Sequence, residues 1–588
     1  MQELKNLGFE IGMPNDWQTY STGKTHKYTY PEPGRVGGYS VAIEYLTREI
    51  GKVAIWVQNV DIDRTKKYKL SGWMKTENII GTGASMKVDW KDINGQFLSS
   101  SAIMSRQKGT ISWKYFEGTV TPDQNAVKAT IVLDLYDCSG KVWFDDMSFS
   151  DIIPPPITNI FYVATNGSDN NPGTESRPFR TIQKSTDIVN PGDSVYVKQG
   201  IYNERVNITR SGSVNSIITF KPYSGHIVTI DGSNISLPIY NGLIDMKNVS
   251  NIKFSGFRVI DSNKEGIALR NCNNITIEDN YIRDTAWNGI VSWKGNNIII
   301  DSNECERCVT IAGTEIVSMQ QTQNFQVKNN NIHHGDVAGD PHRYGGADGI
   351  GIKDGSKNGK VYENKVIYLP YNFGQPNVHG RTGIYIDGWD SITSNIDVFN
   401  NLVHHTGAGV GISTEIGGIA KDIKIYNNIL YENEVGIIAP LHHEADKPAG
   451  LIQNVTCVNN TIYKNDTGWK YGIFLGRVQG TTPTLLDNVK VINNILSKNP
   501  KYQIFKVNRS GVTKILIDHN LIFGPSSELG TNYIRSDPQF VNETNRNFHL
   551  KSTSPAINAG TSVEAPSFDL DNKKRPQGTK FDIGAYEY

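Results

Sequence analysis

A short phrase recurs between residues 280 and 522 of this 588-residue chain: an asparagine, any residue, then an apolar residue. The copies begin at Asn280, Asn303, Asn330, Asn364, Asn401, Asn428, Asn460, Asn494 and Asn520. Successive copies are 23 to 37 residues apart, and no helical stripe of apolar residues lies between them. This pattern predicts a solenoid of short strands, in which residues one repeat apart stack about 4.8 Å from each other.

The composition excludes some classes of function. Lysine plus arginine and aspartate plus glutamate both number 59, so no excess of charge supports binding to nucleic acid or to a membrane surface. No apolar run reaches the roughly 18 residues that a membrane-spanning helix needs. At 588 residues, the chain is too long for one ordinary domain.

Residues 1–151 contain short runs of alternating apolar and polar residues separated by turn residues, which predicts a β-sandwich domain. Residues 6–10, 70–75 and 142–146 resemble the family 4/9-type carbohydrate-binding modules. The resemblance implies a structural Ca²⁺ held by acidic residues near the two ends, and Glu10 and Asp146 are the matching residues. It also implies tryptophans that stack on sugar rings, with packing in the core as the alternative for each; the candidates are Trp17, Trp56, Trp90 and Trp113.

Residues 152–159 read as a stiff Pro-rich linker. The segments 161–169, 178–183 and 192–196 then resemble the start of secreted right-handed parallel β-helix enzymes, and the C-terminal segment 537–586 matches the same group. The resemblance implies a short helix near residues 179–189 that caps the solenoid.

We therefore expect an all-β chain in which a right-handed parallel β-helix, residues 160–588, is preceded by the β-sandwich domain. The first residues, MQELKNLGFE, show no secretory signal, so the protein is either cytosolic or secreted with its leader removed. We expect a secreted monomer, because this architecture suits extracellular polymers.

Each turn of the solenoid should contain a strand that begins with glycine and alternates inward apolar residues with outward residues. The sequence places such strands at residues 266–270, 289–293, 349–353, 383–387, 409–413, 436–440 and 472–476, with another through 314–318. The outward fifth position then reads Arg270, Trp293, Lys353, Asp387 and Ser413. The longest loops of the solenoid leave from the same rungs and should project over this face. We therefore expect the face to form a cleft. The alternative is a solvated stripe with a salt bridge between Lys353 and Asp387.

The chemistry expected on this face is glycoside hydrolysis, which needs two carboxylates flanked by aromatic walls. Asp387 and Glu415 are the expected catalytic pair, and Asp390 is a spare carboxylate that could replace either. We expect Lys353 to keep Asp387 ionised, and Glu415 to have the raised pKa and act as the acid. No catalytic cofactor is expected, and both retention and inversion fit the expected spacing. The residues expected to contact the sugar are Lys353, Trp293, Tyr385, Trp389, Arg270, His379, Arg381, His442, Glu444 and Arg477.

Residues 383–388 and 412–415 are similar to the region of β-helix glycosidases, including β-xylosidase-type members, in which an Asp and a later Glu on neighbouring turns do the work. A register shifted by one turn would pair Glu415 with Glu444 instead. The substrate implied is a polysaccharide or oligosaccharide, for example a xylan-like polymer of the plant cell wall.

Three other functions remain open. A polysaccharide lyase would use Lys353 as the base beside Arg381 or His379, with Ca²⁺ on Asp387 and Asp390. A C5-epimerase is indicated only by the tripeptide Asp340-Pro-His342 in a Gly-rich stretch. A carbohydrate-binding surface solenoid would need no catalytic residue at all.

Overall fold

The computed structural model describes residues 4, 8–10, 16–36, 38–152, 158–310, 314–334, 348–367, 369, 381–441, 447–476 and 484–588. The chain divides into two compact units, Met1–Pro155 and Pro156–Tyr588. The predicted Pro-rich linker falls mostly outside the described residues. Within the described part of the chain, no helix is long and apolar enough to cross a membrane.

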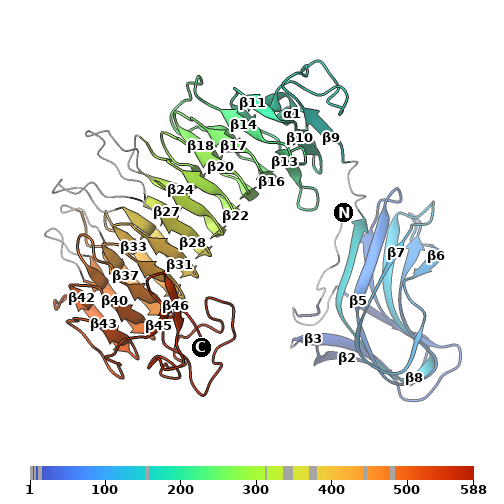
Figure 1. Ribbon diagram of the computed structural model, residues 1–588. Helices are drawn as coiled ribbons and strands as arrows, with labels where there is room; N and C mark the ends of the chain where they lie inside the picture. Colours follow the sequence, from blue (N-terminus) through green and yellow to red (C-terminus); the bar gives the residue numbers. More distant parts are fainter. Residues whose placement is uncertain are drawn as a thin grey trace. The chain divides into compact units, whose positions relative to one another are not determined.

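The N-terminal unit is a β domain whose eight described strands pair in one antiparallel network that folds over its own core (Figure 1). Its core includes Leu70, Met86 and Leu133, all fully buried. The two longest strands, of 25 residues each, are paired along most of their length. The strands are β1 (Gln18–Ser21), β2 (His26–Pro33), β3 (Tyr39–Tyr45), β4 (Val53–Asp61), β5 (Lys67–Lys91), β6 (Phe97–Ala102), β7 (Gln107–Val120) and β8 (Lys128–Ile152).

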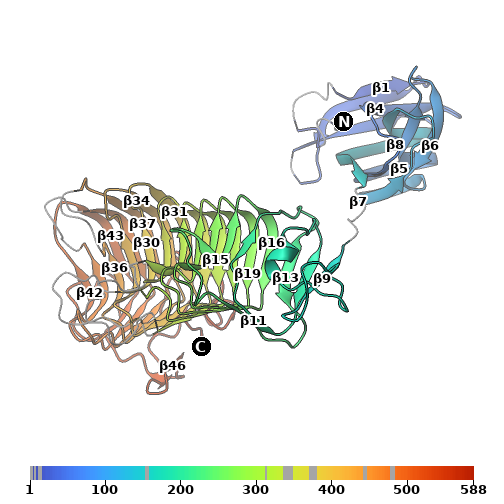
Figure 2. The same ribbon diagram turned by 90° about the horizontal axis from the view of Figure 1, so that it is seen from above.

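The second unit is a right-handed parallel β-helix, which confirms both the solenoid predicted from the repeat and the fold implied by the resemblance (Figures 1 and 2). Each rung contributes one strand to each of three parallel sheets, which contain 13, 12 and 11 strands among the described residues.

The 13-stranded sheet consists of β9 (Ile160–Val163), β10 (Ser194–Val197), β13 (Ile218–Pro222), β16 (Ser250–Ser255), β19 (Asn273–Glu278), β22 (Asn296–Asp301), β25 (Gln323–Lys328), β28 (Lys357–Tyr362), β31 (Ile392–Phe399), β34 (Ile419–Tyr426), β37 (Leu451–Val458), β40 (Leu485–Ile492) and β43 (Val512–Asp518). The 12-stranded sheet consists of β11 (Gly200–Tyr202), β14 (Val228–Asp231), β17 (Arg258–Ile260), β20 (Tyr281–Arg283), β23 (Glu304–Glu306), β26 (Asn331–His333), β29 (Lys365–Ile367), β32 (Leu402–His404), β35 (Ile429–Tyr431), β38 (Thr461–Tyr463), β41 (Ile495–Ser497) and β44 (Leu521–Phe523). The 11-stranded sheet consists of β12 (Val206–Ile208), β15 (Gly242–Lys247), β18 (Glu265–Arg270), β21 (Ile290–Trp293), β24 (Glu315–Gln320), β27 (Asp348–Lys353), β30 (Thr382–Asp387), β33 (Ala408–Ser413), β36 (Val435–Ala439), β39 (Tyr471–Leu475) and β42 (Tyr502–Lys506).

The repeated asparagines form a buried ladder at the turn between the 13- and 12-stranded sheets. The Oδ1 of Asn364, for example, accepts from the backbone N–H and the Nδ2 of Asn330, at 3.0 and 2.9 Å. Its own Nδ2 donates to the carbonyl of Val327 at 2.8 Å and to Asn401 at 3.0 Å. The ladder therefore satisfies polar groups that the sharp turn would otherwise leave buried without partners.

The N-terminal end of the solenoid is covered by the helix α1 (Ile182–Thr186), within the range that the sequence predicted. Thr181 caps this helix by accepting from the N–H of Lys184 at 3.1 Å, and Ile182 packs into the core.

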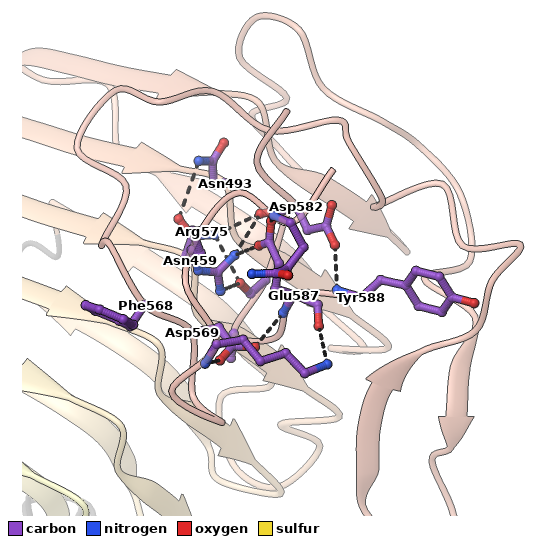
Figure 3. A network of polar contacts seen from close by, with 12 residues as sticks. Asn459, Asn493, Phe568, Asp569, Arg575, Asp582, Glu587 and Tyr588 are labelled. Atoms are coloured by element: carbon purple, nitrogen blue, oxygen red, sulfur yellow. Dashed lines mark hydrogen bonds and ion pairs between the residues drawn. The ribbon is translucent and has the colours of Figure 1, made fainter. Parts of the chain in front are cut away.

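The C-terminal segment packs on the outer side of the 12-stranded sheet. It contains the short hairpin β45 (Phe540–Asn542) and β46 (Asn547–Leu550), and Phe548 and Ile583 pack with Tyr463 of that sheet. Within this segment, Arg575 and Glu587 form an ion pair in which nitrogen and oxygen are 2.6 Å apart (Figure 3). Neither side chain is exposed to solvent.

Candidate functional site

The outer face of the 11-stranded sheet carries the predicted column of side chains. Strands β18, β21, β24, β27, β30 and β33 pair in register so that Arg270, Trp293, Gln320, Lys353, Asp387 and Ser413 follow one another. Between them, Ile384 and Ile386 of β30 point into the core and are fully buried. The predicted alternation of inward and outward residues is thus confirmed, and Asp387 lies on the outside of the solenoid, one rung from Lys353.

Asp387 is nevertheless buried, because neighbouring groups cover it. Its Oδ1 accepts from the backbone N–H groups of Trp389, at 2.9 Å, and Glu415, at 3.2 Å. Its buried Oδ2 accepts no hydrogen bond from any described residue. Burial and the nearby charge of Glu415 raise the pKa of Asp387 to about 7. The expectation that Lys353 keeps Asp387 ionised is therefore wrong, since burial outweighs the lysine's charge.

Glu415 lies beside Asp387, two residues beyond the end of β33, and is half-buried. The hydroxyl of Tyr385 donates to its Oε1. Tyr385 is itself buried, and burial together with the charges of Asp387 and Glu415 raises the pKa of its hydroxyl well above the ordinary value. The tyrosine consequently stays protonated and donates to Glu415.

Lys353 bonds to a carboxylate that the sequence analysis did not single out. Its Nζ lies 3.1 Å from the Oε1 of Glu315, whose Oε2 accepts from the hydroxyl of Ser318 at 2.7 Å. The same Nζ lies 4.8 Å above the ring of Trp389. Burial disfavours the charged amine, but the carboxylates of Glu315, Asp387 and Glu415 together outweigh it and raise the pKa of Lys353. The structure thus pairs Lys353 with Glu315 rather than with Asp387.

Glu315 was not predicted because the strands of this sheet were recognised in the sequence by an initial glycine, and its strand has none. The strand expected at residues 314–318 is β24, Glu315–Gln320, and Ile316 stands where the other strands have glycine. Asp348, which pairs with Glu315 one rung on, was also missed. Burial raises the pKa of Asp348 to about 7, and its Oδ1 accepts from the N–H of Thr382 at 2.5 Å. Glu315 and Asp348 are each the first residue of their strand, directly before the alternating residues. An acidic residue at that position was the signal in the sequence that could have identified them.

Two turns hold the site in place through contacts between backbones. The N–H of Gly418 donates to the carbonyl of Trp389 at 2.6 Å. A Cβ added to Gly388 would lie 2.7 Å from the backbone of Ile419, and one added to Gly418 would lie 2.4 Å from the carbonyl oxygen of Trp389. Only glycine fits at these two positions, so the turn after Asp387 and the turn carrying Glu415 are locked together.

The other predicted site residues lie apart from the pair. Asp390 is exposed on the turn after β30, where it accepts from the hydroxyl of Ser391 at 3.2 Å. Arg270 pairs with Asp245, four rungs from Asp387. Trp293 is 37% exposed three rungs from Asp387, and Arg381 is buried directly before β30. His379, His442, Glu444 and Arg477, like the tripeptide Asp340-Pro-His342, lie outside the described residues.

In the N-terminal unit, the structure corrects the choice of tryptophans. Trp17, Trp56 and Trp90 are all at least 93% buried and belong to the core, so they cannot stack on a sugar. Trp113 is half-buried on the outer side of β7. Beside it lies a pair that the sequence analysis missed, Trp73 and Tyr115, whose ring centroids are 5.5 Å apart.

The proposed calcium ligands fit the ion only in part. The Oδ2 of Asp146 already accepts from the guanidinium of Arg35, at 3.0 and 3.2 Å. The Oε1 of Glu10 accepts from the N–H of Tyr39 at 3.0 Å. The neighbouring Asp145 is buried and accepts from the backbone N–H groups of Arg35 and Asp146, both at 2.8 Å, and burial is the main cause that raises its pKa. Both predicted ligands thus already have partners, and the described residues include no group of three or more His, Cys, Asp or Glu side chains that could hold a metal ion.

Comparison with known proteins gives the family. A family model described as "Pel9A-like, right handed beta helix region" matches residues 161–474, more than half of the chain. A second model, of the carbohydrate-binding module 4/9 group and described as "BppA domain 1", matches residues 16–149. The fold and the N-terminal module define a β-helix protein of the carbohydrate-active class. The chain belongs to the Pel9A-like right-handed β-helix family.

The individual proteins that this chain resembles share 30% or less of their residues with it over the matched regions. The uncharacterized protein YwoF of Bacillus subtilis (strain 168) is 27% identical over 443 residues, which cover 67% of this chain and 91% of YwoF. Pectate lyase PEL9 of Emericella nidulans is 30% identical over 89 residues, 15% of this chain and 22% of PEL9. The structure of XylC with xylose has a TM-score of 0.48 at 14% identity, and the similarity covers 72% of this chain and 98% of XylC.

Proposed function

We propose that the solenoid is a glycoside hydrolase whose catalytic groups are Asp387 and Glu415. The observation that carries the proposal is the buried carboxyl of Asp387, which has a pKa of about 7 and an Oδ2 without a partner among the described residues, next to a second carboxylate. Two carboxyl groups in different environments, one able to hold a proton near neutral pH, are what hydrolysis of a glycosidic bond requires.

In this proposal Asp387 is the acid, the reverse of the roles expected from the sequence. Its protonated Oδ2 gives its proton to the glycosidic oxygen as the bond to the anomeric carbon breaks. Glu415, oriented by the hydroxyl of Tyr385, then attacks the anomeric carbon or removes a proton from the attacking water. The anomeric configuration of the first product, followed by NMR, distinguishes these two routes.

The second candidate is a polysaccharide lyase, which is favoured by the names of the family and of PEL9. In that reaction Lys353 would remove the proton next to a uronate carboxyl. A lysine can act as a base only in its neutral form. Because Lys353 is paired with Glu315 and has a raised pKa, it holds its proton near neutral pH, which counts against this candidate.

Product analysis of digests of xylan and of polygalacturonate tests the choice between the two. We expect new reducing ends without the ultraviolet absorbance of an unsaturated uronate, and activity that survives EDTA. Asp387→Asn and Glu415→Gln should each lower kcat by about 10²- to 10⁴-fold, the usual contribution of an acid or base.

Asp390→Asn is the matched control, since it makes the same change on an exposed carboxylate three residues away and should leave kcat nearly unchanged. An unsaturated product that disappears with EDTA would favour the lyase instead. Binding of the polymer with no product at all would favour a surface solenoid.

We further propose that the protein acts outside the cell on a polysaccharide to which the N-terminal module attaches it. Trp73, Tyr115 and Trp113 on the outer side of β5 and β7 are the module's candidates for sugar stacking. A structural Ca²⁺ at Glu10 and Asp146 stays a prediction, which a Ca²⁺-dependent rise in the melting temperature of the module would support.

A further inference from the structure

Two cysteines lie together inside the solenoid, at the corner that leads from β23 to β24. Cys305 is the middle residue of β23, Cys308 follows three residues later, and both side chains are buried in the core. A Cβ added to Gly289, on the preceding rung, would lie 3.0 Å from the sulfur of Cys308 and 3.5 Å from that of Cys305. The two groups are free thiols that hydrogen-bond to each other, and this contact, together with burial, raises the pKa of Cys305. The sulfurs are therefore neighbours in a space that the glycine leaves open.

The turn between the two cysteines directs both side chains inward. Residues three apart in a continuous strand point to opposite faces. Arg307, which separates Cys308 from the end of β23, has a φ of 49°, in the left-handed region. This turn places the side chains of Cys305 and Cys308 on the same side of the chain, which is the orientation that a disulfide requires.

Cys308 stands at a position where later rungs carry a polar ladder. The position lies three residues after the middle residue of each strand in the 12-stranded sheet, and on four successive rungs it holds Thr406, Asn433, Asn465 and Asn499. The N–H of Asn433, for example, donates to the Oδ1 of Asn465 at 2.9 Å. The sulfur of Cys308 instead lies 3.8 and 3.7 Å from the carbonyl oxygens of Ile282 and Glu306. These contacts are long, so hydrogen bonding explains the residue at this rung less well than it explains the asparagines.

The pair also lies next to the strand that carries Glu315. Gly289, which packs against both sulfurs, donates its N–H to the carbonyl of Ile316 at 2.9 Å. Ile316 directly follows Glu315, the partner of Lys353. A covalent bond at this corner would therefore fasten the start of β24.

We propose that Cys305 and Cys308 are joined by a disulfide in the exported protein. The inference rests on the location outside the cell proposed above, where disulfides persist, and it is independent of the reaction at Asp387. In this step both S–H bonds break and one S–S bond forms. The two electrons and two protons pass to the disulfide of a thiol–disulfide oxidoreductase of the export route, which becomes a dithiol. The bond forms while the chain folds, because burial makes the thiols of the folded protein unreactive.

The test is peptide mapping of the full-length protein exported to a bacterial periplasm. The protein is denatured in an alkylating reagent, which blocks free thiols, and is digested with trypsin without a reductant. Trypsin cleaves after Arg307, between the two cysteines, and separates peptide 295–307 from peptide 308–328. We expect the two peptides to stay joined in the mass spectrum and to separate after reduction.

Counting the reactive thiols of the denatured protein gives a matched control. We expect three in the wild type, because two of the five cysteines are in the bond. Cys308→Ala should raise the count to four, since it frees Cys305. Cys457→Ala removes a buried cysteine elsewhere in the core and should lower the count to two. A reductant should lower the melting temperature of the wild type by a few degrees and leave that of Cys308→Ala unchanged.

Three results would overturn the inference. The first is a pair of separate peptides in which both cysteines are alkylated, and the second is five reactive thiols in the wild type. The third is a bond from Cys305 or Cys308 to any other cysteine. The peptide map of the wild type decides even where a variant fails to fold. Failure of the proposed hydrolysis is read separately, from the products, because the map does not depend on the reaction.

Discussion

Asp387 and Lys353 show how neighbouring side chains decide what one residue can do. The sequence shows that these two residues stand one rung apart, and the structure confirms it. It does not show that burial dominates the titration of Asp387, or that Glu315 takes the lysine as its partner. The raised pKa of Asp387 and the pairing of Lys353 with Glu315 both depend on how completely neighbouring residues bury these side chains. The alternation of apolar and polar residues in the sequence does not show that.

The titration of Asp387 makes the stability of the protein depend on pH. The pKa of Asp387 is raised from 3.8 to about 7 on folding, so between these values the folded protein holds a proton that the unfolded chain has lost. The stability from this group is complete below the lower value and is lost as the pH rises through 7. An asparagine side chain at this position cannot ionise and keeps an oxygen for the two backbone N–H groups. We expect Asp387→Asn to raise the melting temperature relative to wild type at about pH 8 and to change it little at about pH 4.

Circular dichroism melts of both proteins across this range measure the effect. Asp390→Asn, the exposed control, should show no such trend. A difference between Asp387→Asn and wild type that is constant with pH would mean that Asp387 is not the group with the raised pKa.

Glu315 separates the two candidate reactions. Glu315→Gln removes the main charge that keeps Lys353 protonated, so the pKa of Lys353 should fall. For a lyase, this change should increase activity near neutral pH, because more of the base is neutral. For the hydrolase, we expect kcat/KM to fall by about tenfold and its pH profile to shift, since the charge near Asp387 changes. The pH dependence of kcat/KM is the measurement.

At the scale of strands and turns, the asparagine repeat is the element that the sequence predicted best. A buried asparagine ladder requires the same residue at the same turn of every rung, so its period is visible without knowledge of the fold. Glycines mark most strands of the 11-stranded sheet in the sequence, but β24 has Ile316 in place of the glycine, so its Glu315 could not be recognised in this way. The neighbouring aromatic residues Trp73 and Tyr115 of the N-terminal unit were not predicted, because the sequence of a strand does not show which of its aromatic side chains are exposed.

The ladder predicts a large difference between two chemically identical substitutions. Asn364→Asp removes the donors to Val327 and Asn401 and places a carboxyl in the buried ladder, which should destabilise the solenoid by about 3 kcal/mol or more. Asn358→Asp makes the same change in an exposed row of asparagines, where we expect an effect within about 0.5 kcal/mol. Urea denaturation gives both values, and equal losses would show that the buried ladder contributes no more than the exposed one.

At the scale of the whole solenoid, the C-terminal segment ties several rungs together. Arg575 is fully buried and bonds to Glu587 at 2.6 Å and to the carbonyl of Gly584 at 2.9 Å (Figure 3). Asn459, whose Nδ2 bonds to the carbonyls of Asp582 and Gly584, links the segment to the solenoid. The sequence resemblance placed this segment in the right group of proteins, but its partners come from rungs over a hundred residues away and could not be predicted.

Breaking the buried ion pair should therefore be costly. Glu587→Ala leaves the guanidinium of Arg575 buried without its charge partner, and we expect a loss of about 3–5 kcal/mol in the free energy of unfolding. Lys498→Ala breaks an exposed ion pair with Glu543 and should cost less than about 1 kcal/mol. Chemical denaturation followed by tryptophan fluorescence compares the two, and similar losses would contradict this role of the C-terminal segment.

In the proposed reaction, Asp387 and Glu415 catalyse the addition of water across a glycosidic bond. The most direct test is the mass spectrum of the products formed from the polysaccharide in water labelled with heavy oxygen. We expect saturated products that carry one labelled oxygen at the new reducing end, formed about 10²- to 10⁴-fold more slowly by Asp387→Asn and by Glu415→Gln. Unlabelled products with an unsaturated end, lighter by one water and still formed by both variants, would contradict it.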